Sequence, residues 1–235
     1  EKSDPFSWPT YRGNAARSGS TTATVRPPLR RRWKTELGGP LSAVTLAGGR
    51  LLVARGDAHT VCALDADRGT PLWRFTAGGR IDTPPTIHAG MALFGSHDGY
   101  VYCLRASDGE MVWRYRAAPE CTRAVANGQV ESLWPVSGSV LLHDEVAYTA
   151  AGRSSYLDGG IVLLGLDPRT GRVVHRRRLS SEHVGALDPP PAETAAEMDG
   201  QLPEEVKIER RNRVLEAQQA VSMAVNRRLV GEILP

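Results

Sequence analysis

The sequence predicts an all-β fold, a partial β-propeller of about three four-stranded blades, followed by a C-terminal α-helix. Two observations predict the blades. Tryptophans recur every 40 residues, at Trp33, Trp73 and Trp113, and short apolar segments alternate with glycine-containing turns between them. A fixed period of this length is typical of repeat architectures, in which each repeat is one unit of supersecondary structure. The 24 glycines and 16 prolines among 235 residues also favour many short elements and tight turns.

The two later tryptophans end segments of one kind. These segments are Ala63–Trp73 and Cys103–Trp113, and a third copy, Gly165–His175, follows after a longer interval. Each copy predicts a strand, a tight turn and a second strand. The glycine at the seventh position supplies the positive φ that the turn needs. These glycines are Gly69, Gly109 and Gly171, and the residues expected to bond back to the turn backbone are Asp67, Asp108 and Thr170.

Two further strands are predicted upstream of each of these hairpins. They are 42–47 and 50–54, then 85–88 and 91–95, then 136–142 and 146–151. Four strands per period is the number in one propeller blade. Trp33 is expected on an outer strand that begins the array.

A tryptophan at this spacing can cover the seam between neighbouring blades. Its large flat side chain on the outermost strand would bury on the order of 200 Å² at each junction. The alternative is that the tryptophans fill ordinary sandwich cores, and the regular period favours the propeller.

The repeat resembles a known family. The pattern Ala-x-Asp-x-x-x-Gly-x-x-x-Trp, matched in full at Ala63–Trp73, is similar to the repeat of pyrroloquinoline-quinone (PQQ)-type propellers, and Trp8–Gly19 resembles their opening segment. The resemblance covers about residues 6–180. In the second copy Arg105 replaces the aspartate, and in the third His175 replaces the tryptophan.

This family includes quinoprotein alcohol dehydrogenases and the outer-membrane assembly propeller. The resemblance implies a periplasmic or extracellular protein, whose signal peptide would lie outside the given chain. Because family members have more blades, we expect a fragment or an open arc that needs a protein partner or the remaining blades. No cofactor is expected, since PQQ would need a complete propeller.

An insertion marks the candidate binding loop. Trp113 and His175 are 62 residues apart, 22 more than the period, and the excess falls in 118–133 and 152–160. Long connections on a rigid scaffold are where recognition residues collect. The second stretch could bind a carbohydrate or another polar ligand, or it could be a plain glycine-rich turn. Its candidate ligand-binding residues are Arg153, Ser154, Ser155, Tyr156 and Asp158.

The sequence favours binding or scaffolding over catalysis. The three cysteines, Cys62, Cys103 and Cys121, form no CxxC pair, and the six histidines show no paired spacing, so no metal site is predicted. No Gly-x-Ser-x-Gly or Gly-x-Gly-x-x-Gly motif is present, nor the adjacent cysteine pair of the family's dehydrogenases. The alternative function is a fragment of a quinone-dependent dehydrogenase.

Charge and hydropathy give no sign of a nucleic-acid site or a membrane span. The formal net charge is +3, and the short arginine runs 30–32 and 176–178 are interpreted as solvated strand edges or connectors. Nucleic acid is therefore an unlikely partner. No apolar stretch of eighteen residues occurs.

The C-terminal part differs from the rest. The predicted domains are an N-terminal segment (1–32), the blades (33–180), a linker (181–202) and a helix (203–235), which Pro203 and the apolar periodicity after it indicate. Residues 192–235 resemble the linker helix of radical-SAM methylthiotransferases, which modify transfer RNA or a ribosomal protein. The CxxxCxxC motif of that family is absent, so an inactive remnant is a further alternative.

Overall fold

The computed structural model describes residues 6–181, which belong to the first of two compact units of the chain, Glu1–Glu182. The predicted linker after residue 181, the helix 203–235 and the methylthiotransferase-like stretch 192–235 lie outside the described residues.

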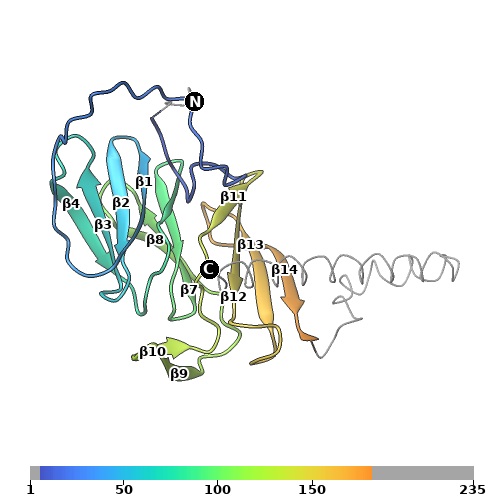
Figure 1. Ribbon diagram of the computed structural model, residues 1–235. Coiled ribbons are helices and arrows are strands. Elements are labelled where there is room, and N and C mark those ends of the chain that lie inside the picture. The colour runs from blue at the N-terminus through green and yellow to red at the C-terminus, as the bar shows by residue number, and fades with distance from the viewer. Residues whose placement is uncertain (1–5, 182–235) are drawn as a thin grey trace, which may run out of the picture. The chain divides into compact units, whose positions relative to one another are not determined.

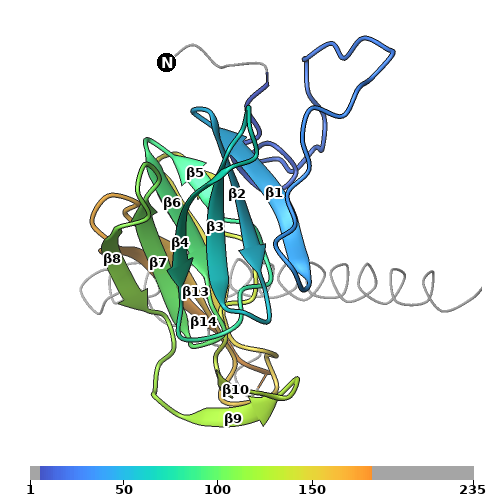
Figure 2. The ribbon, with the colours of Figure 1, turned by 90° about the vertical axis from the view of Figure 1, so that its left-hand side faces the viewer.

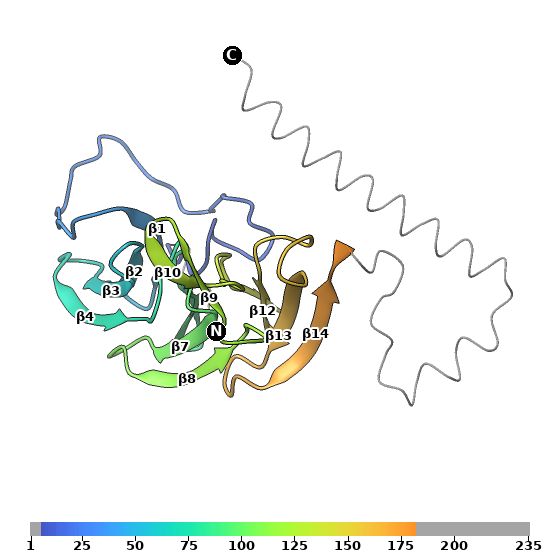
Figure 3. The same cartoon turned by 90° about the horizontal axis from the view of Figure 1, so that it is seen from below.

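Residues 6–181 contain three four-stranded antiparallel sheets, whose strands follow one another in sequence order, and one two-stranded sheet described below (Figures 1 and 3). The predicted all-β propeller fold is confirmed. The first sheet contains β1 (Leu41–Ala47), β2 (Arg50–Arg55), β3 (Thr60–Asp65) and β4 (Pro71–Thr76). The second contains β5 (Thr86–His88), β6 (Met91–Gly95), β7 (Tyr100–Arg105) and β8 (Met111–Arg116). The third contains β11 (Leu141–His143), β12 (Val146–Ala151), β13 (Ile161–Leu166) and β14 (Val173–Leu179).

The first two strands of each blade are joined by a two-residue turn in which both residues have positive φ. The turns are Gly48-Gly49, Ala89-Gly90 and Asp144-Glu145. This conformation matches the twist of the strands it joins, so it holds the first two strands of each blade in register.

The turn between the third and fourth strands is held by an aspartate of the repeat. Asp65 Oδ1 accepts hydrogen bonds from the backbone N–H groups of Asp67 and Arg68, and Asp167 does the same for residues 169 and 170. The prediction for Asp67 was wrong, because its carboxylate pairs with Arg32 in solvent.

In the second blade, where Arg105 occupies the aspartate position, another carboxylate holds the turn. Asp108 accepts the N–H of Glu110, and this bond lowers the pKa of Asp108. In the third blade, Thr170 Oγ1 accepts the N–H of Arg172. Blades 1 and 3 therefore share the aspartate contact, while blades 2 and 3 share a contact to the residue just before the fourth strand, from Asp108 and Thr170.

The core lies in the seams between blades. Blade 2 contributes one face, with Phe94 and Leu104, to a cluster shared with Leu52 and Val61 of blade 1. Its other face, with Leu93, Val101 and Cys103, joins a cluster shared with blade 3. Because side chains alternate along a strand, the middle blade is apolar on both faces.

The two seams are closed by Trp73 and Trp113, and Trp33 makes the same contact with blade 1. The indole Nε1–H groups of Trp33, Trp73 and Trp113 each donate to a backbone carbonyl in the turn of the following blade, at 3.0 Å. The rings lie on the turn glycine: a Cβ added at Gly109 would come within 2.5 Å of the Trp73 ring. The glycine thus serves twice, since its φ of +77° suits the turn and its missing side chain admits the indole.

Two expected strands differ in the structure. Trp33 lies in no strand, and no described strand runs beside it; its indole still makes with blade 1 the contact that Trp73 and Trp113 make in the seams. Residues 136–140 are not a strand either, and only β11 remains of that prediction. Val136 and Val140 are buried against blade 2, which accounts for the apolar pattern of this segment. The Val136 N–H donates to the Ser96 carbonyl of blade 2.

The N-terminal segment is fastened to the inner strands of two blades. The backbones of Trp8 and Leu46 exchange two hydrogen bonds, and the Pro9 carbonyl accepts the N–H of Ile87. In the described part of the chain, no helix has the length and hydropathy needed to cross a bilayer.

Replacing Gly109 with alanine tests the seam. We expect Gly109→Ala to lower the free energy of unfolding by about 2–4 kcal/mol, since it adds backbone strain and a clash with the Trp73 ring. Gly90→Ala is the matched control, because Gly90 has a similar φ of +76° and nothing within 4 Å of its added Cβ. It should lose only about 1 kcal/mol. Urea denaturation measures both, and equal losses would show that the indole contact contributes nothing.

The thiols should differ in reactivity. Burial raises the pKa of Cys62 and raises that of Cys103 to about 12, whereas Cys121 is exposed. Because the thiolate is the reactive form, an aromatic disulfide reagent at mildly alkaline pH should modify Cys121 rapidly and the other two only after denaturation. Rapid reaction of all three thiols in the native protein would contradict the buried placement.

Candidate functional site: the inserted hairpin

The insertion after blade 2 folds into a hairpin that lies across one end of the blades (Figures 1 and 2). Its strands are β9 (Arg123–Ala126) and β10 (Gln129–Ser132). They are joined by Asn127-Gly128, whose φ angles of +52° and +72° form a tight hairpin turn.

The two faces of the hairpin differ in chemistry. Val125 and Val130 are paired across the strands and are 77% and 57% exposed. On the other face, Gln129 and Glu131 lie opposite Ala126 and Ala124 and turn toward the blades. The hairpin is therefore attached by polar groups and presents an apolar pair to solvent.

The end of β10 nearest the turn is bound to blade 1. Gln129 Oε1 lies 2.7 Å from Nε2 of His59, and its amide nitrogen donates to the Asp57 carbonyl. Both partners lie in the turn between β2 and β3.

Glu131 attaches the hairpin to the other two blades. Its carboxylate is 2% exposed and lies 3.1 Å from His97 Nδ1, in the β6–β7 turn, and 3.4 Å from the guanidinium of Arg153, in the β12–β13 loop. The Nδ1 atom of His97 lies within ion-pair distance of the Glu131 carboxylate but makes no hydrogen bond. Asn127 also donates to Glu131. A buried carboxylate is tolerated only with such partners, so this contact fixes the hairpin in place.

His97 continues the network toward blade 1. Its Nε2 lies 2.8 Å from Asp82, which also pairs with Arg80, and Arg80 reaches Asp57 at 3.1 Å. The inserted hairpin thus lies over a network of ionisable side chains that links connections of the blades.

The predicted ligand-binding residues do not converge. Only Arg153 joins the network, through Glu131 and the Ser132 carbonyl. Ser154 Oγ accepts the N–H of Tyr156, whose ring is 80% exposed. Ligand binding by this loop stays a prediction. Of the other two residues, Ser155 accepts two bonds from Ser181 at its carbonyl, and Asp158 has a φ of +56°.

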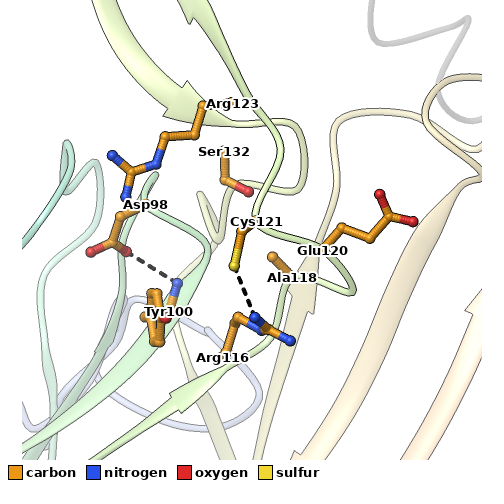
Figure 4. A pocket seen from close by; sticks show the side chains of 8 residues that line it. All are labelled: Asp98, Tyr100, Arg116, Ala118, Glu120, Cys121, Arg123 and Ser132. Carbon is orange, nitrogen blue, oxygen red and sulfur yellow. Dashed lines mark hydrogen bonds between the residues drawn. The ribbon is translucent and has the colours of Figure 1, made fainter.

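A small pocket lies beside the base of the hairpin (Figure 4). Arg116 donates to Cys121 Sγ at 2.9 Å, and Asp98 lies on the opposite wall. The Asp98 carboxylate accepts the phenol O–H of Tyr102 at 2.5 Å. Burial and this bond raise the pKa of Tyr102. Within residues 6–181, no group of three or more acidic, His or Cys side chains is arranged to hold a metal ion.

The fold and the repeat define a β-propeller of the PQQ-like repeat class. A family model described as outer membrane protein assembly factor BamB matches residues 14–192. The chain therefore belongs to this family.

Two curated relatives carry the same name. The chain is 31% identical over 134 residues to outer membrane protein assembly factor BamB of Burkholderia pseudomallei and 28% identical over 85 residues to that of Nitrosomonas eutropha. These matches cover 57% and 36% of this chain, but only 31% and 20% of the relatives. The chain thus spans about a third or less of the length of these proteins.

Among solved structures, a europium-containing methanol dehydrogenase is similar, with a TM-score of 0.60. The identity is 16%, and the match covers 82% of this chain and 34% of the enzyme. At this identity the likeness concerns the fold alone.

Glu131→Gln should release the hairpin. The change removes the negative charge of the carboxylate that contacts both His97 and Arg153. We therefore expect amide hydrogen exchange in residues 123–132 to accelerate at least about tenfold. Glu120→Gln, an exposed carboxylate of the same insertion, is the control. Unchanged exchange in Glu131→Gln would mean that the buried carboxylate does not hold the hairpin.

Proposed function

We propose that this chain is a protein-binding scaffold of outer-membrane protein assembly, and that it binds through the outward face of the β9–β10 hairpin. Membership of the family supports the role, since the matched relatives are named assembly factors. On this proposal the protein acts on the periplasmic side of the outer membrane. A loop held by a rigid scaffold is a common place for binding residues, so the inserted hairpin favours a binding function over a catalytic one.

The observation that carries the proposal is the exposed valine pair on an anchored support. Exposed apolar side chains are ordinary when single, but Val125 and Val130 lie side by side on a protruding hairpin. Glu131 and Gln129 hold the hairpin to loops of three blades, so little conformational entropy is lost when a partner binds it.

The outer backbone edge of β9 adds a second means of recognition. The hairpin forms a separate two-stranded sheet, so this edge carries no described strand partner, whereas on β10 the N–H of Ser132 already donates to the His97 carbonyl. An extended segment of a partner could pair with such an edge and cover the valines with its own apolar side chains.

Photocrosslinking in cells tests this function. With benzoylphenylalanine in place of Val125 or Val130, we expect crosslinks to a subunit of the outer-membrane protein assembly machinery, identified by mass spectrometry. The control position is Val25, which is 63% exposed on the N-terminal segment.

A second experiment measures co-purification of the same subunit without crosslinking. Val125→Asp should weaken it at least about tenfold, and Val125→Thr, which has a similar shape, should weaken it less. Crosslinks at Val25 and none at the hairpin would refute this surface.

A further inference from the structure

The outer strands of the blades carry a second surface, distinct from the hairpin. β4, β8 and β14 are the last strand of each sheet, and they lie along the outer side of the arc in Figure 3. Together they contain six arginines and no aspartate or glutamate: Arg74, Arg114, Arg116, Arg176, Arg177 and Arg178.

The arginines occupy a repeated position. Arg74 and Arg114 directly follow the seam tryptophans, and Arg176 follows His175 in the third copy. All three are exposed, and within residues 6–181 none of the three has a carboxylate at ion-pair distance. Arg114 lies over the ring of Tyr100, 5.3 Å from its centroid, which holds it at the surface.

An exposed aliphatic residue accompanies each of these arginines. In all three blades the register shifts just before the tryptophan position, which leaves Leu72, Val112 and Val174 as unpaired bulge residues. They are 47%, 47% and 50% exposed. A bulge turns a side chain out of the regular pleat, so the fold displays an aliphatic group beside a guanidinium three times along one rim.

Edge protection accounts for part of this pattern. Bulges and positive charges keep outer strands from pairing with other chains. That role does not require exposed Leu and Val, and it does not require the exclusion of acidic residues. Aliphatic groups next to cations are the combination that membrane-surface proteins use, because the cations bind anionic headgroups while the apolar groups enter the interface.

We propose that this rim, formed by the outer strands of the blades, binds an anionic phospholipid surface. A nucleic acid fits less well, since the aliphatic groups would face its phosphates and the tryptophan rings, which could stack on bases, are taken up in the seams.

Vesicle co-sedimentation of the full chain tests the proposal. We expect binding to vesicles of phosphatidylglycerol and phosphatidylethanolamine, and none to phosphatidylcholine vesicles. The triple variant Arg74→Gln, Arg114→Gln, Arg176→Gln should bind roughly a hundredfold less tightly, because each cation near an anionic surface contributes about fivefold. Replacing the same three arginines with lysine keeps the charge and should preserve binding.

Two controls separate the rim from net charge and from misfolding. Arg26→Gln, Arg30→Gln, Arg31→Gln removes the same charge from the N-terminal segment and should leave binding intact; thermal melts confirm that each variant is folded. The proposal is overturned if the chain does not bind the anionic vesicles, if the two arginine-to-glutamine triple variants lose binding equally, or if neutral vesicles bind as well. Binding to a DNA duplex but not to the vesicles would also overturn it.

Discussion

The stacking of an indole on a glycine turn is the contact on which the rest of the structure depends. A four-stranded blade buries both faces only against its neighbours, so the angle at which blades meet decides whether the core closes. Trp73 reaches from β4 onto Gly109, and Trp113 reaches from β8 onto Gly171. The same contact at each junction gives the blades a common spacing and brings their equivalent turns to one end.

That common spacing is what makes the hairpin a defined surface. His59, His97 and Arg153 lie in equivalent connections of the three blades, and β10 reaches all of them through Gln129 and Glu131. A shift at either seam would separate these partners and leave a buried carboxylate unpaired. The seams therefore position the apolar pair that we propose as the binding face, although they lie outside it.

The sequence predicts the blades well because their signals are local. A tryptophan period and a turn glycine with positive φ need no knowledge of distant residues. The strand predicted at 136–142 is mostly absent. The prediction failed because apolar residues buried against another blade give the same sequence pattern as the alternating residues of a strand. The hairpin was missed although Asn127-Gly128 between alternating residues is a strong hairpin signal. Its anchor could not be predicted, since Glu131 finds His97 and Arg153 only after the blades have stacked.

A double-mutant cycle on Trp73 and Gly109 tests the central contact most directly. Trp73→Ala, Gly109→Ala and the double variant are compared by urea denaturation. If the indole lies on the glycine, removal of the ring should relieve the clash, and the free-energy changes should be non-additive by at least about 1 kcal/mol. Additive changes would contradict the contact and, with it, the account of how the blades are held.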